Sequence, residues 1–387
     1  MDYTKILSDR SQNIKPSGIR KFFDIAAGVP DIISLSVGEP DFMTPWAIRR
    51  EAIHVLENKK TIYTSNAGLM PLRVAVSEYF KRTIRTEYNP ESEIVITVGG
   101  SEAIDIAIRA LVNPGDEVIV TEPCFVSYSP IVELTGGVPI AASTCVENEF
   151  KLTPEVLKPL ITPKTKALIL SYPNNPTGAV MRKHELEAIA ELLRDTDIAI
   201  ISDEIYAELT YGEAHVSIAE LPGMRERTIV VNGFSKAFAM TGWRLGFVAA
   251  PEPIAQQILK IHQYAVMCSP TVSQYAAVVA LNECIGDVCD MADEYNMRRR
   301  FVLDGLKSIG LDCFTPEGAF YVFPSIKNVG LTSQEFCTKL IKEKKVAVVP
   351  GDAFGACGEG YVRVSYAYSL KHLTTAIERI GEFLNEI

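Results

Sequence analysis

The chain lacks several patterns that mark common classes of protein. Its eight cysteines are dispersed without a C-x-x-C pair and its five histidines are isolated, so we expect reduced thiols and no metal site. No apolar run approaches the roughly 20 residues of a membrane span, and the opening MDYTKILSDR has no apolar stretch typical of a secretory signal. No G-x-G-x-x-G follows a predicted strand, which argues against a nicotinamide dehydrogenase. We therefore expect a cytoplasmic protein without a membrane segment.

The charge and size of the chain narrow its class further. A formal net charge of -10 disfavours nonspecific binding to nucleic acid or to an anionic membrane. The 387 residues, of which 47% are hydrophobic, can form a large core and suggest two lobes or domains. We expect small-molecule partners.

Short apolar runs alternate with amphipathic segments between residues 93 and 251. Continuous hydrophobicity is typical of strands buried on both faces, and the intervening segments have helical spacing. This alternation predicts a mostly parallel sheet covered by helices on both faces. The predicted strands are residues 94–97, 118–120, 167–170, 198–201, 228–231 and 245–248.

A different pattern follows Pro270, with longer helical stretches and then EGAFYVFP, VAVVPG and GYVRVSYA, which predict a small mixed sheet. We assign residues 45–280 to a large domain and residues 281–387 to a small C-terminal domain. Residues 1–44 are expected to be an N-terminal segment that packs with the small domain.

Three polar residues follow predicted strands at the sheet edge where open α/β sheets bind ligands. Asn175 lies in SYPNNPTG, Asp203 in SDEIY and Lys236 in NGFSKAFAMTGWR. Each has an ordinary alternative: Asn175 fits a turn, Asp203 fits a helix cap, and Lys236 fits a solvated surface. A lysine in an apolar loop can also have a lowered pKa and form a Schiff base with an aldehyde. Their joint placement favours a site.

A series of motifs in fixed order strengthens this interpretation. The chain resembles the class I and II aminotransferases, the aspartate-aminotransferase-like branch of fold-type I pyridoxal-phosphate enzymes, and among bacterial members the aromatic, aspartate and N-acetyl-diaminopimelate aminotransferases. The resemblance implies an α/β fold with a large, mostly parallel domain and a smaller α+β domain. It rests on SGIRKFF, LSVGEPDF, YTSNAG, GGSEA, NPGDEV, YPNNPTG, SDEIY, FSKAFAMTGWRLG, GAFYVFP and YVRVSYA.

The resemblance implies a role for each residue around the cofactor ring. Lys236 looks like the lysine that carries pyridoxal 5'-phosphate and later moves the substrate α-proton. Asp203 would hold the proton of the pyridine nitrogen. Tyr206 and Asn175 would hydrogen-bond the ring hydroxyl. Phe125 falls where relatives stack an aromatic residue on the ring, although many have Trp there, and core packing is its alternative.

A second group would bind the cofactor phosphate. Arg244 has the planar fork that suits a phosphate, and Ser235 supplies a hydroxyl. Gly100 and Ser101 open a predicted helix, whose backbone N–H groups and dipole favour an anion. Glu102 would repel a phosphate, so we expect its side chain to turn away.

Tyr63, in YTSNAG, falls where relatives supply a phosphate contact from the partner subunit. The resemblance therefore implies a homodimer with a shared active site.

A third group would bind the substrate. Arg363 resembles the arginine that receives the α-carboxylate, although strand alternation alone would place it on a solvated face. Gly38 resembles a backbone contact to the same carboxylate, at a point where a side chain would crowd the substrate. Asn175 would border this site as well. Arg20 is a candidate near the substrate entrance, with a helix-surface role as its alternative.

The resemblance implies a two-step transfer of an amino group from an L-amino acid to a 2-oxo acid, with 2-oxoglutarate as the expected acceptor. The donor would be aromatic, aspartate or a related amino acid. Two alternatives stay open: a pyridoxal-phosphate-dependent β C–S lyase on the same fold, and a non-catalytic regulatory or binding protein with a vestigial cofactor domain.

Overall fold

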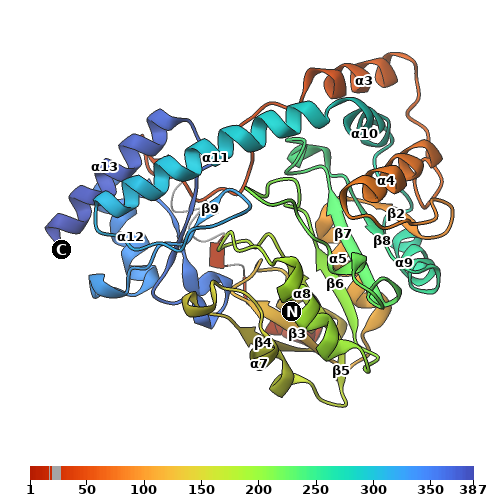
Figure 1. Cartoon of the computed structure of the whole chain (residues 1–387), viewed down its shortest axis with the longest axis horizontal. Coiled ribbons are helices and arrows are strands. Elements are labelled where there is room, and N and C mark those ends of the chain that lie inside the picture. Colours follow the sequence, from red (N-terminus) through yellow and green to blue (C-terminus); the bar gives the residue numbers. More distant parts are fainter. Residues whose placement is uncertain (17, 20–27) are drawn as a thin grey trace.

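The computed structural model describes residues 1–16, 18–19 and 28–387. A seven-stranded sheet in the order β2-β8-β7-β6-β5-β3-β4 lies at the centre of its larger part (Figure 1). Strand β8 runs antiparallel to β2 and β7, and the other neighbouring pairs are parallel. The strands are β2 (Ile94–Thr97), β3 (Glu117–Glu122), β4 (Val138–Ser143), β5 (Thr165–Ser171), β6 (Ala199–Asp203), β7 (Thr228–Gly233) and β8 (Gly246–Ala249).

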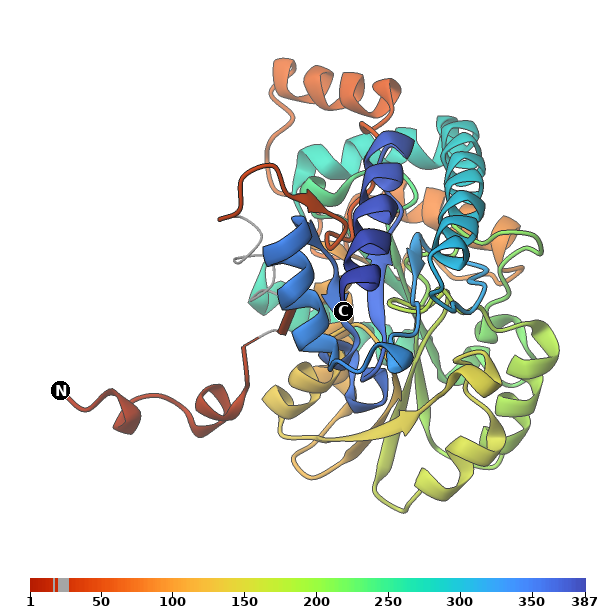
Figure 2. The ribbon, with the colours of Figure 1, turned by 90° about the vertical axis from the view of Figure 1, so that its left-hand side faces the viewer.

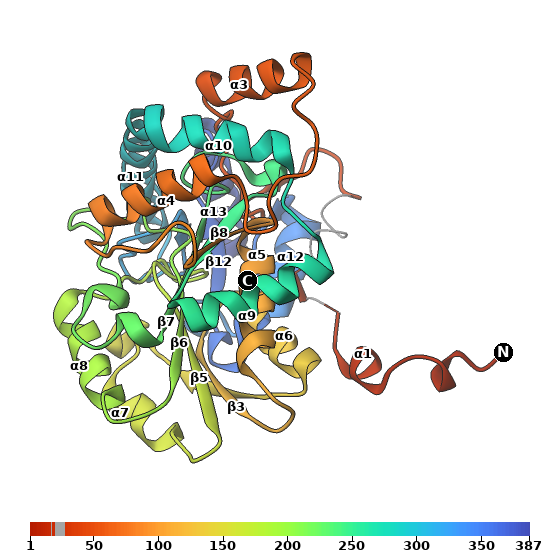
Figure 3. The same ribbon diagram turned by 90° about the vertical axis from the view of Figure 1, so that its right-hand side faces the viewer.

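Helices cover both faces of this sheet because successive strand residues point to opposite sides. In β6, Ile201 packs in the cluster that contains α5, α6 and α9, whereas Ile200 packs in the cluster that contains α7 and α8. Figure 3 shows α5, α6 and α9 together on one side of the strands. The helices of this part are α3 (Trp46–Glu57), α4 (Met70–Thr83), α5 (Gly99–Leu111), α6 (Tyr128–Thr135), α7 (Pro154–Leu157), α8 (Lys183–Leu193), α9 (Glu252–Ala265) and α10 (Thr271–Glu283).

The mostly parallel sheet and six of its strands are confirmed, but β4 was not predicted from the sequence. This strand lies at the edge of the sheet and, among the strands that the structure describes, pairs only with β3. Most of its residues are exposed or half-buried, and Pro139 lies within it. Such a segment lacks the continuous hydrophobicity of a central strand, and proline is tolerated in edge strands.

The C-terminal part packs three helices, α11 (Ile285–Ser308), α12 (Ser333–Lys344) and α13 (Leu370–Glu386), around short strands. Helix α11 runs from the neighbourhood of α10 to that of α13 (Figure 1). Instead of one mixed sheet, this part contains two sheets. An antiparallel sheet has the order β11-β12-β9, and β10 pairs in parallel with β1 of the N-terminal segment. The strands are β1 (Ile33–Ser34), β9 (Tyr321–Val322), β10 (Val346–Ala347), β11 (Val349–Pro350) and β12 (Val362–Ser365).

The N-terminal segment has two parts with different neighbours. Residues 28–42 include Leu35 and Phe42, which pack in the apolar cluster of the C-terminal part. Residues 1–16 extend from the body of the molecule (Figure 2), and their helix α1 (Asp9–Asn13) lies near α6, where Arg10 donates to the Leu134 carbonyl at 3.2 Å. Within the described residues, no helix is both long enough and apolar enough to cross a membrane.

Candidate active site

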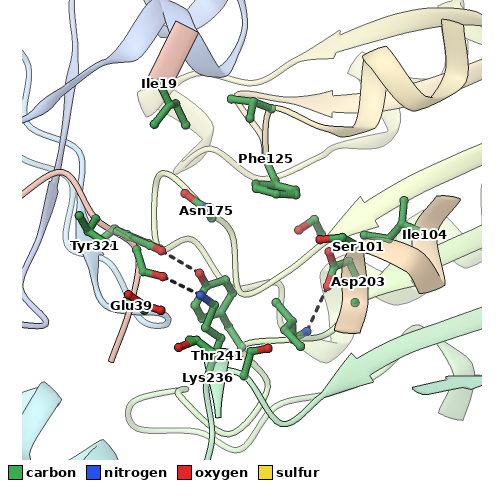
Figure 4. A pocket seen from close by; sticks show the side chains of 18 of the residues that line it. Ile19, Glu39, Ser101, Ile104, Phe125, Asn175, Asp203, Lys236, Thr241 and Tyr321 are labelled. Atoms are coloured by element: carbon green, nitrogen blue, oxygen red, sulfur yellow. Dashed lines mark hydrogen bonds between the residues drawn. The ribbon is translucent and has the colours of Figure 1, made fainter. Parts of the chain in front are cut away.

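A cavity of about 880 Å³ lies where the carboxyl ends of the central strands face the C-terminal part. Figure 4 shows Ser101 and Asp203 on one side of it, Glu39 and Tyr321 on the other, and Lys236 between them. Most of the predicted site residues line this cavity: Gly38, Gly100, Ser101, Phe125, Asn175, Asp203, Tyr206, Ser235, Lys236, Arg244 and Arg363.

Lys236 enters the cavity from the loop that follows β7. Its Nζ donates a hydrogen bond to the Gly38 carbonyl at 2.6 Å. Burial lowers the pKa of Lys236 to about 8; the Glu39 carboxylate opposes this shift, and the positive charges of Arg363 and Arg244 add to it. An amine with such a pKa is partly neutral near physiological pH and therefore nucleophilic. The solvated-surface alternative for this lysine is wrong.

Asp203 ends strand β6 and is 6% exposed. Its Oδ2 accepts a hydrogen bond from the Tyr128 hydroxyl at 2.6 Å, and its Oδ1 accepts one from the Ile205 N–H at 3.2 Å. Burial raises the pKa of the Asp203 carboxyl, and the Tyr128 hydrogen bond opposes that shift. The helix-cap alternative is wrong because residues 205–208 form a turn.

Asn175 and Tyr206 border the same space from two other loops. Asn175 follows β5, and its Oδ1 accepts a hydrogen bond from Arg363 Nη1 at 2.9 Å. This contact leaves the amide NH₂ as the group of Asn175 that can donate. The Tyr206 hydroxyl lies 2.8 Å from the Tyr321 hydroxyl. Burial raises the pKa of Tyr206 well above its usual value, so the phenol stays protonated and can donate.

Arg363 comes from β12 and is 3% exposed, so the expectation of a solvated face is wrong. Its Nη2 donates to the Ser36 carbonyl at 2.5 Å, and its guanidinium lies 4.5 Å from the centre of the Tyr321 ring. Its Nε is buried and has no partner among the described residues. Burial lowers the pKa of Arg363 from its high usual value. A buried guanidinium with a free donor is suited to bind a carboxylate.

The first turn of α5 and Arg244 form a positively polarised end of the cavity. Arg244 donates to the Thr241 carbonyl at 3.1 Å and forms no ion pair within the described part of the chain. A Cβ at Gly99, which has a φ of +78°, would lie 2.8 Å from Arg244 Nη2. Gly99 therefore permits the approach of the guanidinium to the helix N-terminus, where backbone N–H groups and the helix dipole favour an anion.

Glu102 turns away from this end of the cavity, as expected. Its Oε1 lies 2.8 Å from Nδ1 of the buried His262, and its Oε2 accepts a hydrogen bond from the Val98 N–H. The carboxylate thus stabilises the start of α5 without adding a negative charge to the cavity lining.

The structure treats four further predicted site residues differently. Phe125 lines the cavity, and its ring meets that of Tyr128 edge to face at 5.7 Å. Tyr63 is 75% exposed and lies outside the cavity lining. Arg20 lies outside the described residues. At Gly38, an added Cβ would clash with the Tyr321 hydroxyl, so a neighbouring side chain already requires glycine there.

A model of the family described as aminotransferase class I and II matches residues 30–380. The chain belongs to this family. The aminotransferase is 48% identical to an aspartate aminotransferase of Pyrococcus abyssi over 98% of both chains. It is 47% identical to aromatic-amino-acid aminotransferase 2 of Thermococcus litoralis, again over 98% of both. The crystal structure of an aromatic aminotransferase from Pyrococcus horikoshii superposes with a TM-score of 0.90 and 46% identity, over 94% of this chain and 99% of that one.

These matches show an enzyme that transfers amino groups, which rules against the lyase and the non-catalytic alternatives. Family members depend on pyridoxal 5'-phosphate, and the cavity has the chemistry to bind it. The anion-binding end suits the phosphate, the Asp203 carboxylate suits a protonated ring nitrogen, and the Lys236 amine suits the aldehyde. The unpartnered Nε of Arg363 remains for a carboxylate.

Sequence reasoning missed four residues that shape this site. Glu39 and Tyr321 line the cavity from the motifs GEPDF and GAFYVFP. Tyr128 and Ser171 also line the cavity. A tyrosine three residues after Phe125 at the start of a helix looks like core packing, and no local pattern indicates that its hydroxyl reaches Asp203.

Proposed function

We propose that this aminotransferase carries pyridoxal 5'-phosphate on Lys236 and exchanges amino groups between an L-amino acid and a 2-oxo acid, with 2-oxoglutarate as the acceptor. The donor is an aromatic amino acid, aspartate or a related amino acid. When bound, the cofactor withdraws electrons from the substrate α-carbon. The observation that carries the proposal is that the Lys236 amine lies in one cavity with the Asp203 carboxylate and the Arg363 guanidinium, where burial lowers the pKa of the lysine.

Each side chain then has a separate task. The Asp203 carboxylate holds the proton at the ring nitrogen, and the Asn175 amide and the Tyr206 hydroxyl donate to the ring oxygen. The half-buried Phe125 limits the movement of the ring. The phosphate is bound by Gly100, Ser101, Ser235 and Arg244.

Arg363 allows one site to bind both the amino donor and the oxo-acid acceptor. Amino donor and oxo-acid acceptor both carry a carboxylate next to the reacting carbon, and a guanidinium fork binds either in the same orientation. Asn175 holds Arg363 Nη1 and so restricts the orientation of the fork. The Gly38 carbonyl holds the Lys236 amine at 2.6 Å, from where the amine removes and returns the proton at the substrate α-carbon.

The cavity lining favours a donor with an apolar or aromatic side chain. Ile19, Val37 and Val126 line it together with Phe125. Among the described residues, its cations are Lys236, Arg244 and Arg363, which already have tasks in this proposal. A dicarboxylic substrate, whether aspartate as donor or 2-oxoglutarate as acceptor, needs one more cation for its distal carboxylate, from a segment or a subunit beyond those residues.

We propose further that two copies of the chain form a homodimer with shared active sites. Met43, Trp46, Ile62 and Tyr264 are large apolar residues that are 58% to 88% exposed. Thr271 Oγ1, at the start of α10, donates to the Ile62 carbonyl at 2.7 Å, and α10 packs against α3, whose first residue is Trp46. Exposed apolar surface of this kind is typical of an interface.

A shallow hollow connects that apolar surface with the active site. Met43 and Arg49 line it together with Arg244, which also lines the main cavity. Tyr63 follows Ile62, whose carbonyl accepts a hydrogen bond from Thr271, next to Pro270 in the wall of the hollow. A partner chain seated there can therefore bring its own Tyr63 to the end of the cavity that binds the phosphate.

The proposed domains are residues 45–280, residues 281–387 and an N-terminal segment of residues 1–44 that joins the latter. Lys236 and Asp203 come from the first of these, whereas Tyr321 and Arg363 come from the second. A relative movement of the two domains then closes the site around a substrate and excludes water.

The test of the proposed function is a half-reaction. The purified holoenzyme, mixed with one amino donor and no acceptor, should release one equivalent of 2-oxo acid per active site and stop. Addition of 2-oxoglutarate should restart turnover, and a panel of donors should show highest specificity constants for aromatic amino acids. Release of ammonia and pyruvate from a β-substituted donor, faster than the half-reaction, would contradict the proposal.

The shared site has its own test. Sedimentation should give twice the mass of the chain. Mixed dimers of a Lys236→Ala chain and a Tyr63→Ala chain should recover activity, because one of their two sites combines native residues from both chains. Mixtures as inactive as the two variants alone would contradict sharing.

A further inference from the structure

Tyr128 is a buried residue of the cavity wall to which the proposed function gives no task. It opens helix α6 and is 1% exposed. Its hydroxyl oxygen lies 2.6 Å from Asp203 Oδ2 and 2.9 Å from Ser171 Oγ. Three elements, α6, β5 and β6, therefore meet at this one hydroxyl.

The direction of these hydrogen bonds follows from counting protons. A phenol has one proton, and an ionised carboxylate can only accept. Tyr128 therefore donates to Asp203, and the Ser171 hydroxyl, which can act either way, is free to donate to the Tyr128 oxygen. Burial, and next the negative charge of Asp203, raise the pKa of Tyr128 well above its usual value, so the proton stays on the phenol at any working pH.

The surroundings of Asp203 make this donor important. Burial raises the pKa of Asp203, and the Tyr128 hydrogen bond is the largest of the interactions that lower it. The Ile205 N–H also lowers it, Glu204 raises it, and Lys236 lowers it from across the cavity. Two further titratable groups of the described residues lie close by: the buried Cys124 thiol beside Tyr128 and the buried Tyr206 phenol, on which the charge of Asp203 acts. Burial raises the pKa of both well above their usual values, so both stay neutral.

We propose that Tyr128 is a positioning residue that keeps Asp203 ionised and directs its carboxylate toward the cofactor, and so keeps the ring nitrogen protonated. This inference rests on the proposed role of Asp203. A neutral donor is suited to the task. It stabilises the anion without forming an ion pair, whereas a lysine or arginine at the same place would compete with the ring nitrogen for the carboxylate.

The informative variant is Tyr128→Phe, which removes one oxygen and retains the ring that packs against Phe125. Without the donor, the Asp203 carboxylate becomes more basic and takes the proton from the ring nitrogen. We expect the ¹⁵N resonance of a cofactor labelled at that nitrogen to move toward the unprotonated value at a pH where the parent holoenzyme remains protonated. The loss of one hydrogen bond to a charged group should shift the titration of the ring nitrogen by about one to two pH units and decrease kcat by about tenfold to a hundredfold.

A matched control separates this role from a structural one. Tyr172 is also buried; its hydroxyl bridges the Phe150 carbonyl and the Leu152 N–H, and it does not line the cavity. Tyr172→Phe should lower the melting temperature and leave the ¹⁵N resonance of the holoenzyme at the parent value. A fluorinated tyrosine at position 128, which is a stronger donor, should keep the nitrogen protonated to at least the parent pH.

Asp203→Asn separates the inferred role of Tyr128 from the proposed role of Asp203. A Tyr128→Phe holoenzyme with the parent ¹⁵N titration overturns the inference if Asp203→Asn does change that titration. If neither substitution changes it, the role of Asp203 in the proposed function fails as well.

Discussion

Two carboxylates lie next to each other at the end of β6 and have opposite surroundings. Asp203 points to the face that carries α5 and α6, lines the cavity, and accepts hydrogen bonds from Tyr128 and from the Ile205 backbone. Glu204, which is 1% exposed, points to the other face and does not line the cavity. It accepts hydrogen bonds from Ser202 at 2.8 Å and Ser217 at 2.6 Å, and lies 3.0 Å from Nε2 of His215.

The two carboxylates differ in which groups stabilise the buried charge. Both carboxylates have lost water and require compensation. At Glu204, polar side chains of the same chain compensate for the lost water, which indicates a structural role. Asp203 faces the cavity with acceptor capacity to spare, since a carboxylate has about four acceptor positions. A cationic ring nitrogen can supply the rest. The sequence SDEIY does not distinguish the two residues, because the distinction lies in what packs against each face.

The largest effect is expected at Lys236, the lysine that lines the same cavity as Asp203. In the proposed function, Lys236 binds the cofactor and moves the α-proton, so Lys236→Ala should abolish nearly all turnover while the hydrogen bonds around Glu204 and the fold persist. Borohydride reduction of the parent holoenzyme followed by peptide mapping should place the reduced pyridoxyl group on Lys236. The same group on another lysine would contradict the assignment.

The second prediction removes the functional member of the carboxylate pair. If Asp203 pairs with the ring nitrogen as proposed, Asp203→Ala removes one partner of a buried pair, at a cost of about 3–5 kcal/mol. The value of kcat should therefore decrease by about 10² to 10⁴. Steady-state kinetics and thermal melting check this together, since the fold should survive. Turnover within tenfold of the parent would mean that Asp203 only stabilises the loop after β6, through its hydrogen bond with the Ile205 N–H.

Much of this site could be predicted because its residues follow strand ends within recognisable motifs. Lys236, Asp203 and Asn175 follow β7, β6 and β5, and the topology of a parallel sheet brings such residues to one edge. The central sheet was predictable for the same reason, since its buried strands are continuous apolar runs. Edge strand β4 was not, because its pattern is mixed.

Contacts between distant elements could not be predicted. Tyr128 and Asp203 are 75 positions apart, and the hydrogen bond between them depends on how α6 packs against the sheet. Arg363 illustrates the same limit. Alternation in β12 correctly places it opposite Val364, but both faces of this short strand are buried, so the inference of a solvated face was wrong.

The third prediction concerns Arg363, which contacts neither carboxylate. Lysine keeps the charge but cannot form the two parallel hydrogen bonds of a guanidinium. Arg363→Lys should decrease the specificity constant about tenfold to a hundredfold, from the loss of about 1.5–3 kcal/mol. The decrease should affect amino donors and oxo-acid acceptors alike, and the cofactor absorbance should not change, because Arg244 and Lys236 are intact. Impairment toward one class of substrate alone would contradict a shared carboxylate site.

The smallest effect on catalysis is expected at Glu204, and it sharpens the comparison with Asp203 most directly. Glu204→Ala leaves the hydroxyls of Ser202 and Ser217 buried without their acceptor, each at about 1–3 kcal/mol, so the melting temperature should decrease clearly. The effect of Glu204→Ala on catalysis should be small, unlike that of Asp203→Ala.

The negative charge of Glu204 raises the pKa of Asp203, so its removal favours the ionised form of Asp203 that the proposed function requires. The value of kcat should thus stay within a few-fold of the parent, and Glu204→Gln, whose amide can still accept from a hydroxyl, should recover part of the lost stability. A loss of kcat as large as that of Asp203→Ala, in protein that remains folded at the assay temperature, would show that the two carboxylates act as one unit across the strand.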